Sequence, residues 1–139
     1  MHSSHKDFIR ADPRRSYYFS FSDGTPFFAL GDTFTLTSPM LSETNRRAYL
    51  EARAGQPFNL LRIFASYTFN AWTGQPHAPV AANPGELWPW GSTPAAPDYD
   101  RLNPRYFQRF ERILGELKAS GLFAEISTTS PPGTPIFGR

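Results

Sequence analysis

The stretch DGTPFFALGDTF, residues 23–34, decides the fold because it joins a turn to an apolar run and then to an acid. Asp23 and Gly24 form a preferred pair for a type I′ turn between two antiparallel strands. The apolar run 26–30 is typical of a strand buried on both faces, and it leads directly to Asp32. We therefore expect a β-hairpin, followed by a carboxylate at the point where a buried strand leaves the core.

Outward from this stretch, strands and helices alternate along the chain. A helix is expected from Ser42 to about residue 55, and a second begins at Asn103, an N-cap residue followed by proline at the first helical position, and ends at Gly121. The first helix is expected to expose its charged residues, which are Arg46, Arg47, Glu51 and Arg53. The second is expected to bury an apolar stripe, which consists of Phe107, Phe110, Ile113, Leu114 and Leu117. Short apolar segments around these helices predict strands at 17–21, 58–65 and 122–126. Strands that alternate with helices need crossover connections, which give a parallel sheet covered by helices. The sequence therefore predicts an α/β fold.

The segment 66–102 is rich in Pro, Gly, Trp and Tyr, and we expect it to form a long binding loop. Aromatic rings in such a loop can stack on the faces of sugars. The alternative is that the rings pack against their own domain, which is an equally good explanation for any single residue. The candidate substrate-binding residues of this loop are Tyr67, Asn70, Trp72, Trp88 and Trp90, and Tyr99 and His77 are weaker candidates.

Composition narrows the classes of function. The chain has 139 residues, about one domain, and its 14 Lys+Arg against 12 Asp+Glu are scattered, so no nucleic-acid partner is expected. Cysteine is absent and the three histidines lack metal-ligand spacing, so neither a metal site nor a cofactor is expected. The N-terminus lacks the apolar region of a signal peptide and no stretch approaches ~18–20 apolar residues, so we expect no membrane partner and, by default, a cytoplasmic protein. Secretion of a complete form stays open.

Four segments together resemble the start of the apiosidase-like catalytic domain, a family of clan A (β/α)8-barrel glycoside hydrolases. They are DGTPFFALGDTF, YLEARAGQPFN (49–59), LLRI (60–63) and DYDRLNPRYFQRFERILGELKASGL (98–122). The resemblance runs from Phe19 to Ile126 and implies the N-terminal part of a TIM (β/α)8 barrel, preceded by the β-hairpin. A complete barrel takes about 250 residues. One departure is Pro57, where such barrels usually place glycine.

The resemblance implies three regions: an N-terminal extension at 1–16, a partial barrel at 17–126 and an irregular tail at 127–139. The tail, STTSPPGTPIFGR, lacks the apolar continuation that a third barrel strand is expected to show. We hypothesise that the gene is truncated or shifted out of frame near Ser127.

The resemblance also implies roles for individual residues. The active site of such a barrel lies at the carboxyl ends of the strands, so Asp32 and Arg62 are expected to point into one mouth. Arg62 resembles the second-strand arginine that orients the nucleophilic carboxylate, and its alternative is a structural ion pair, with Asp32 as one candidate partner. Retaining glycosidases need two carboxyl groups about 5–5.5 Å apart. The resemblance places both beyond residue 139, since Glu86, Asp98 and Glu125 match no catalytic position.

We therefore expect a glycoside hydrolase-like fragment that binds or acts on plant cell-wall type carbohydrate and hydrolyses O-glycosidic bonds in its complete form. Its expected partners are carbohydrate and the missing remainder of the barrel. Two alternatives stay open: a non-catalytic carbohydrate-binding or interaction module built on the hairpin and the aromatic loop, or an inactive truncated product.

Overall fold

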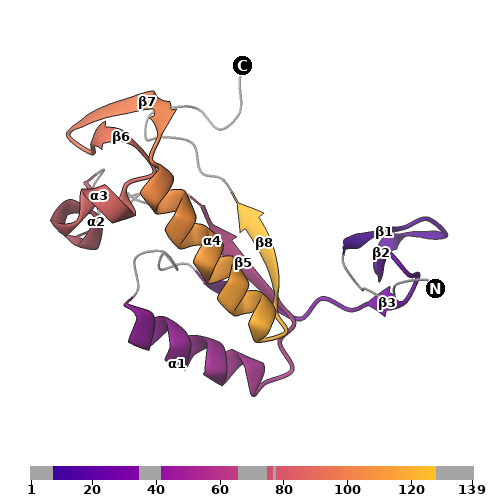
Figure 1. Ribbon diagram of the computed structural model, residues 1–139. Helices are drawn as coiled ribbons and strands as arrows, with labels where there is room; N and C mark the ends of the chain where they lie inside the picture. Colours follow the sequence, from indigo (N-terminus) through magenta and orange to yellow (C-terminus); the bar gives the residue numbers. More distant parts are fainter. Residues whose placement is uncertain (1–7, 35–41, 66–74, 77, 128–139) are drawn as a thin grey trace, which may run out of the picture. The chain divides into compact units, whose positions relative to one another are not determined.

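The computed structural model describes residues 8–34, 42–65, 75–76 and 78–127 (Figure 1). The chain divides into two compact units, Met1–Leu30 and Gly31–Arg139. The first contains a small antiparallel sheet, and the second contains a parallel sheet with helices. The α/β class is confirmed, and the described residues form no closed barrel. None of the helices in the described part of the chain is long and apolar enough to cross a membrane.

The N-terminal unit is built on three antiparallel strands, β1 (Ile9–Asp12), β2 (Arg15–Phe21) and β3 (Pro26–Phe27). The expected hairpin is confirmed, and Asp23 Oδ1 accepts a hydrogen bond from the Thr25 backbone N–H at 2.8 Å in its turn. The type I′ assignment is wrong, because Gly24 has a positive φ of 85° and Asp23 does not. Strand β1 lies within the residues that were expected to form an extension.

The second unit contains a three-stranded parallel sheet in the order β4 (Gly31–Phe34), β5 (Leu60–Phe64), β8 (Phe123–Ser127). The predicted parallel pairing of three strands is confirmed. The predicted first strand is wrong, since Pro26–Phe27 pairs with β2, Phe28 is 81% exposed and a new strand starts at Gly31. An apolar run can supply two different sheets, and composition alone does not show where one strand ends. Asp32 therefore lies inside β4.

Two helices cover one face of this sheet. Helix α1 (Glu43–Ala54) starts at Ser42, whose hydroxyl accepts a hydrogen bond from the Asn45 backbone N–H at 3.3 Å. Helix α4 (Pro104–Ala119) starts at Asn103, whose side-chain oxygen accepts from the Arg105 N–H at 3.1 Å. Gly121 follows α4 with a φ of +73°. Both predicted helices are confirmed, with their caps.

The hydrophobic core lies between these helices and the sheet. Leu61 and Ile63 of β5 are fully buried, and each such side chain contributes roughly 1.5–3 kcal/mol when it leaves water. On α4, Tyr106 is buried, whereas Phe107, which was expected in the buried apolar stripe, is exposed. The helix residues that pack on β5 are Leu50, Phe110, Ile113 and Leu117, with Leu122 after α4.

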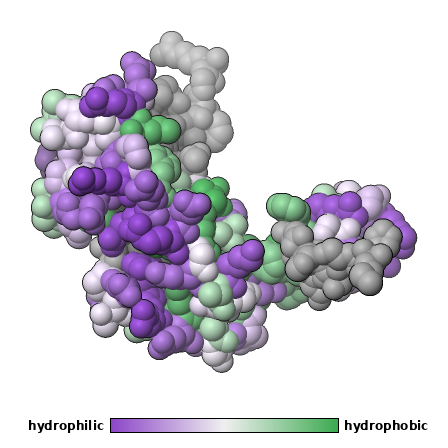
Figure 2. All heavy atoms as spheres, viewed as in Figure 1, coloured by the Kyte–Doolittle hydropathy of each residue, from purple (hydrophilic) through white to green (hydrophobic). Residues whose placement is uncertain are grey.

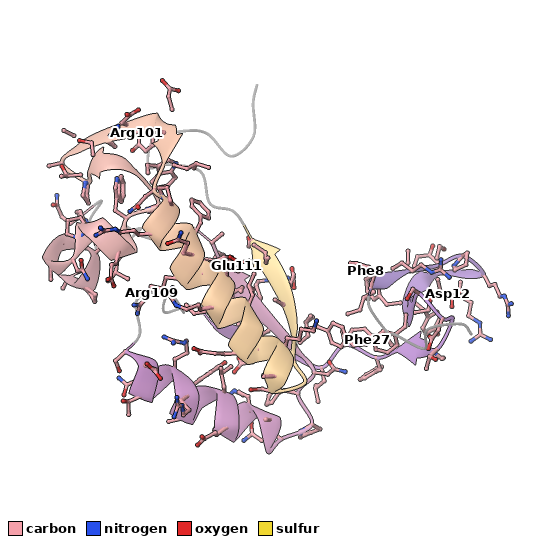
Figure 3. The ribbon with its side chains drawn as sticks, in the orientation of Figure 1. Phe8, Asp12, Phe27, Arg101, Arg109 and Glu111 are labelled. Carbon is pink, nitrogen blue, oxygen red and sulfur yellow. The ribbon has the colours of Figure 1, made fainter. Side chains whose placement is uncertain are left out.

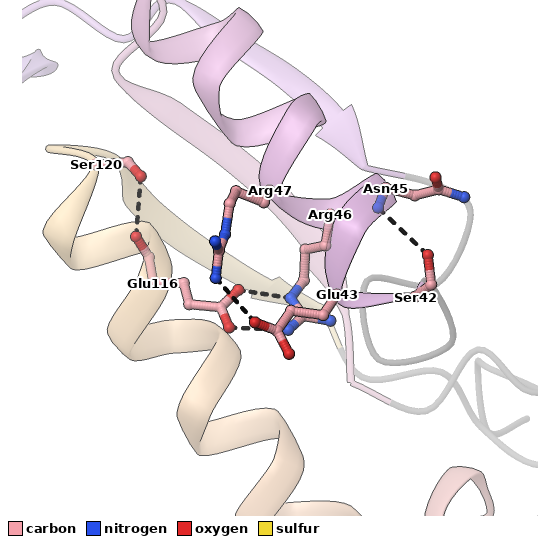
Figure 4. A network of polar contacts seen from close by, with 7 residues as sticks. All are labelled: Ser42, Glu43, Asn45, Arg46, Arg47, Glu116 and Ser120. Atoms are coloured by element: carbon pink, nitrogen blue, oxygen red, sulfur yellow. Dashed lines mark hydrogen bonds and ion pairs between the residues drawn. The ribbon is translucent and has the colours of Figure 1, made fainter.

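An ion pair joins α1 to α4. Glu116 of α4 accepts hydrogen bonds from Arg46 of α1 with both carboxylate oxygens, from Nε at 2.6 Å and from Nη2 at 2.8 Å (Figure 4). The charge pattern of α1 predicts that Arg46 faces solvent, and this is wrong because its side chain is only 7% exposed. The partner lies 70 residues away in the sequence, so no local pattern reveals it.

The segment expected to be an irregular loop has regular structure in its described part. It contains α2 (Ala78–Ala82), α3 (Pro84–Leu87) and the antiparallel pair β6 (Trp90–Thr93) and β7 (Ala96–Leu102). Asn103 fastens this part to the start of α4, since its side-chain amide donates to the Trp88 carbonyl at 2.7 Å and the Gly85 carbonyl at 3.0 Å. Residues 66–74 and 77 lie outside the described residues.

Candidate functional site

The face of the parallel sheet opposite the helices carries the candidate site. Successive strand residues point to opposite faces, and Leu61 and Ile63 point to the helices. Arg62 between them therefore points to the other face. The register places Thr33 of β4 and Glu125 of β8 beside Arg62, one on each neighbouring strand.

Arg62 and Glu125 form an ion pair on this face. Glu125 Oε1 lies 3.0 Å from Arg62 Nε and 2.8 Å from Nη2. The two side chains are 50% and 44% exposed, and an ion pair so open to water contributes at most about 1 kcal/mol. Within the described residues, Glu125 Oε2 accepts no hydrogen bond. The pair therefore offers both guanidinium N–H donors and a carboxylate acceptor to a ligand. Because it contributes little to stability, a ligand can rearrange it without destabilising the fold much.

Asp32 lies on the other side of the sheet. It is the second residue of β4, in register with Leu61, and its side chain faces α1. Its Oδ2 accepts hydrogen bonds from Arg53 Nε at 2.6 Å and from the Tyr49 hydroxyl at 2.9 Å. The Arg53 guanidinium, followed by the Tyr49 hydroxyl, lowers the pKa of the Asp32 carboxyl.

This placement corrects the expected meeting of Asp32 and Arg62 in one mouth. Asp32 does not sit where a strand ends, and the alternation of side chains along a strand puts it on the face opposite Arg62. Arg53, which α1 was expected to expose, is its ion-pair partner, and the partner of Arg62 is Glu125. The substrate-binding role of Asp32 stays a prediction.

The two described tryptophans of the aromatic segment differ in exposure. Trp88 is fully buried with Val80 and Leu87, and its indole N–H donates to the Gly91 carbonyl at 3.3 Å. Trp88 thus matches the alternative that the rings pack on their own domain. Trp90 is partly buried, with its ring edge-on to Trp88 at a centroid distance of 4.9 Å.

Tyr99 extends this aromatic group toward the surface. Its ring lies 5.2 Å from that of Trp90, also edge-on, and it is exposed. Edge-to-face contacts of this kind fix ring orientation and contribute about 0.5–1.5 kcal/mol per pair. The remaining predicted contacts, Tyr67, Asn70 and Trp72, together with His77, lie outside the described residues.

The carboxylates available on the candidate face are few. Among the described strand residues that share the face of Arg62, Glu125 is the only acid. The described residues also contain no group of three His, Cys, Asp or Glu side chains that could hold a metal ion. The described face can therefore bind and orient polar groups, but it does not contain the pair of acids that a retaining glycosidase needs.

Sequence reasoning missed Glu125, Tyr49 and Arg53 as site partners. Glu125 follows an alternation in β8 that could have placed it on one face with Phe123, but its alignment with Arg62 depends on strand register. Tyr49 and Arg53 are four residues apart on α1, so they share a helix face. That spacing is a signal for a shared partner, although it does not name Asp32.

Comparison with known families identifies the family of the chain. The sequence model described as "Apiosidase-like, catalytic domain" matches residues 14–130 of the chain. The chain belongs to this apiosidase-like family. The match includes β4, β5 and β8, and therefore the candidate face with Arg62 and Glu125.

Two solved structures share the backbone arrangement of this apiosidase-like chain. A crystal structure described as that of a candidate glycoside hydrolase from Bacteroides vulgatus has a TM-score of 0.67 at 20% identity, over 91% of this chain and 25% of its own. A second, described as a glycoside hydrolase, has a TM-score of 0.50 at 20% identity, over 78% and 22%. The chain thus spans about a quarter of the length of these structures. No curated protein shows significant similarity to it.

Proposed function

We propose that this chain is the N-terminal portion of an apiosidase-like (β/α)8-barrel glycoside hydrolase that cleaves O-glycosidic bonds in plant cell-wall type carbohydrate. The observation that carries the proposal is the parallel β–α–β–α–β order with an open face that carries an ion pair. Helices cover the Leu61 face, and the opposite face, where a barrel would have its interior, presents the Arg62–Glu125 pair. The family match and the two glycoside hydrolase-like folds support it.

In this proposal the described part of the chain binds and positions the carbohydrate, and it does not itself break the glycosidic bond. Arg62 holds a sugar hydroxyl or a carboxylate of the missing part of the barrel, because its planar guanidinium donates two parallel hydrogen bonds. Glu125 keeps Arg62 in place through Oε1 and offers Oε2 as an acceptor. The nucleophile and the acid/base belong to strands beyond residue 139, since both must flank one bond.

The other predicted residues have different roles in this scheme. Asp32 supports the site indirectly by fastening α1 to β4 through Arg53. Trp88 is buried in the small apolar cluster against which Trp90 packs. Trp90 is only partly buried, so its exposed ring surface is available to a sugar. Tyr67, Asn70 and Trp72 remain proposed substrate contacts. The remainder of the barrel would pair with the outer strands β4 and β8, which each have one neighbour in the described sheet.

The test is a combined turnover and binding assay on the chain, with aryl glycosides and pectin-derived oligosaccharides. We expect no turnover above buffer and weak saturable binding that Arg62→Gln removes. Arg47→Gln is the control, because Arg47 also forms an exposed ion pair, with Glu43, and this pair lies outside the candidate face. Clear turnover that Glu125→Gln or Asp98→Asn abolishes would show that the chemistry lies in this chain and refute the proposal.

A second candidate is a non-catalytic carbohydrate-binding module, and one observation favours it. Tyr17 and Phe19 occupy alternate positions of β2, so they share a face of the N-terminal sheet, and they are 95% and 51% exposed. Exposed aromatic rings mark interaction surfaces. Binding that Tyr17→Ala abolishes and Arg62→Gln leaves intact would select this module, as would stable monomeric folding of the chain. Aggregation that a complementing fragment relieves would select the barrel portion.

A further inference from the structure

A charged cavity lies between α1 and α4, away from the candidate sugar-binding face. Its volume is about 270 Å³, and Arg109 projects into this region from α4 (Figure 3). Hydrophilic residues cover much of the surface over these two helices (Figure 2). We call it the interhelical cavity. The residues that line it are Glu43, Arg46, Arg109, Arg112 and Glu116.

The two acids of the interhelical cavity are already engaged. Glu116 binds Arg46 with both oxygens, and Glu43 binds Arg47, outside the lining, at 2.8 Å. Arg112 has no ion pair with any residue in the described part of the chain. Three guanidinium groups therefore share a wall with two carboxylates, which leaves an excess of positive charge.

Arg109 is one of the residues on which this positive charge acts. Its Nη1 lies 3.5 Å from Glu86 Oε2, and the residue makes other contacts besides this one. Burial is the main cause that lowers the pKa of the Arg109 guanidinium, and the charges of Arg46 and Arg112 lower it further, against the opposing charges of Glu86 and Glu116. Repulsion of this kind raises the free energy of the empty cavity, and a bound negative charge would relieve it.

We propose that the interhelical cavity binds a small oxyanion, namely a phosphate, a sulfate or a sugar carboxylate, through Arg109 and Arg112. The fork of N–H donors on each guanidinium matches two oxygens of such a group. Arg46 lines the same wall, held by Glu116, and adds its charge without moving. The cavity faces away from Arg62, so this site is independent of the sugar-binding proposal.

The probe for the test is inorganic phosphate, titrated into the full chain at constant ionic strength with chloride as the balancing anion. Binding is followed by the NMR resonances of the arginine Nε–Hε groups. We expect saturable binding near a Kd of ~1 mM, weakened about tenfold by Arg109→Gln and by Arg112→Gln, since each removes one charge-assisted contact. Sulfate and galacturonate form two further arms, and the tighter binder identifies the source of the oxyanion.

Lys118→Gln is the matched control, because it removes one positive charge from α4 outside the cavity lining. Arg112 is exposed, so its substitution leaves the fold intact and keeps the test valid if Arg109→Gln unfolds. Loss of binding in Arg112→Gln with retention in Lys118→Gln supports the site. The proposal is refuted if Arg112→Gln and Lys118→Gln weaken phosphate binding equally, or if Arg112→Gln leaves binding unchanged. It is also refuted if binding does not saturate at a phosphate concentration about ten times the expected Kd.

Discussion

Replacing Glu116 by glutamine should destabilise the protein by about 2 kcal/mol. The substitution keeps the volume of the side chain but leaves the guanidinium of Arg46, 7% exposed, without its counter-charge. Removing one partner of a fully buried ion pair destabilises a protein by about 3–5 kcal/mol. Removing one partner of an exposed ion pair destabilises it by at most about 1 kcal/mol. Glu116 is 37% exposed, which places the pair between these limits. One amide oxygen still accepts from Arg46, which keeps the loss at the lower end.

The assay is urea unfolding followed by far-UV circular dichroism, with the m-value checked for constancy. Glu111→Gln is the control, because Glu111 is exposed on the same helix and should change stability by less than about 0.5 kcal/mol. If Glu116→Gln unfolds at the same urea concentration as Glu111→Gln, the Arg46–Glu116 pair does not hold α1 to α4 and the reasoning is refuted.

The same pair predicts a dependence on pH. The hydrogen bonds from Arg46 lower the pKa of the Glu116 carboxyl in the folded protein. The stabilisation is therefore fully present above the ordinary glutamate pKa, about 4.3, and is lost as pH falls below it toward the folded pKa. The wild-type protein should lose more stability than Glu116→Gln between about pH 4.5 and the folded pKa.

Three further substitutions have definite expected results. Asp32→Asn should lower the free energy of unfolding by about 1 kcal/mol in urea and reduce the acid sensitivity below about pH 4, because Arg53 lowers the pKa of Asp32. Asn103→Ala should cost about 2–3 kcal/mol and expose Trp88, seen as a red shift of tryptophan fluorescence, since it removes a helix cap and two hydrogen bonds. Tyr106→Phe should cost about 1 kcal/mol in thermal unfolding and leave the tyrosinate absorbance near pH 10.5 unchanged, because burial raises the pKa of Tyr106.

The helices were predictable because their signals are local. Asn103 and the following proline mark the start of α4, and Gly121 marks its end, all within the sequence of the helix itself. The parallel order of the sheet followed from the alternation of strands and helices. None of these inferences depends on knowing which residues meet across strands.

The candidate site was less predictable because the face of the sheet on which a side chain lies depends on the residue at which its strand starts. A strand that starts at Gly31 instead of ending there moves Asp32 from the rim to the helix side, since a shift of one residue reverses the face. The pairing of Arg62 with Glu125 depends in the same way on register between β5 and β8. Composition identifies neither boundary.

The exposure of individual side chains was also not predictable, because it depends on tertiary packing. Trp88 and Trp90 are two residues apart in one aromatic run, yet only Trp88 is completely enclosed. Arg46 sits in a charged helix that looks solvent-exposed, and its burial depends on Glu116 from a distant part of the chain. Local sequence cannot separate such residues, because packing decides which side chain loses its water.

The central claim is that the sheet face carrying Arg62, opposite the helices, is the face that meets carbohydrate. The most direct measurement is an NMR titration of the labelled chain with pectin-derived oligosaccharides, observing the Nε–Hε resonances of Arg62 and Arg53 separately. We predict that the Arg62 resonance shifts saturably, while Arg53, bound to Asp32 on the helix side, does not move. A shift of Arg53 with Arg62 unchanged, or binding that leaves both resonances in place, would contradict the account.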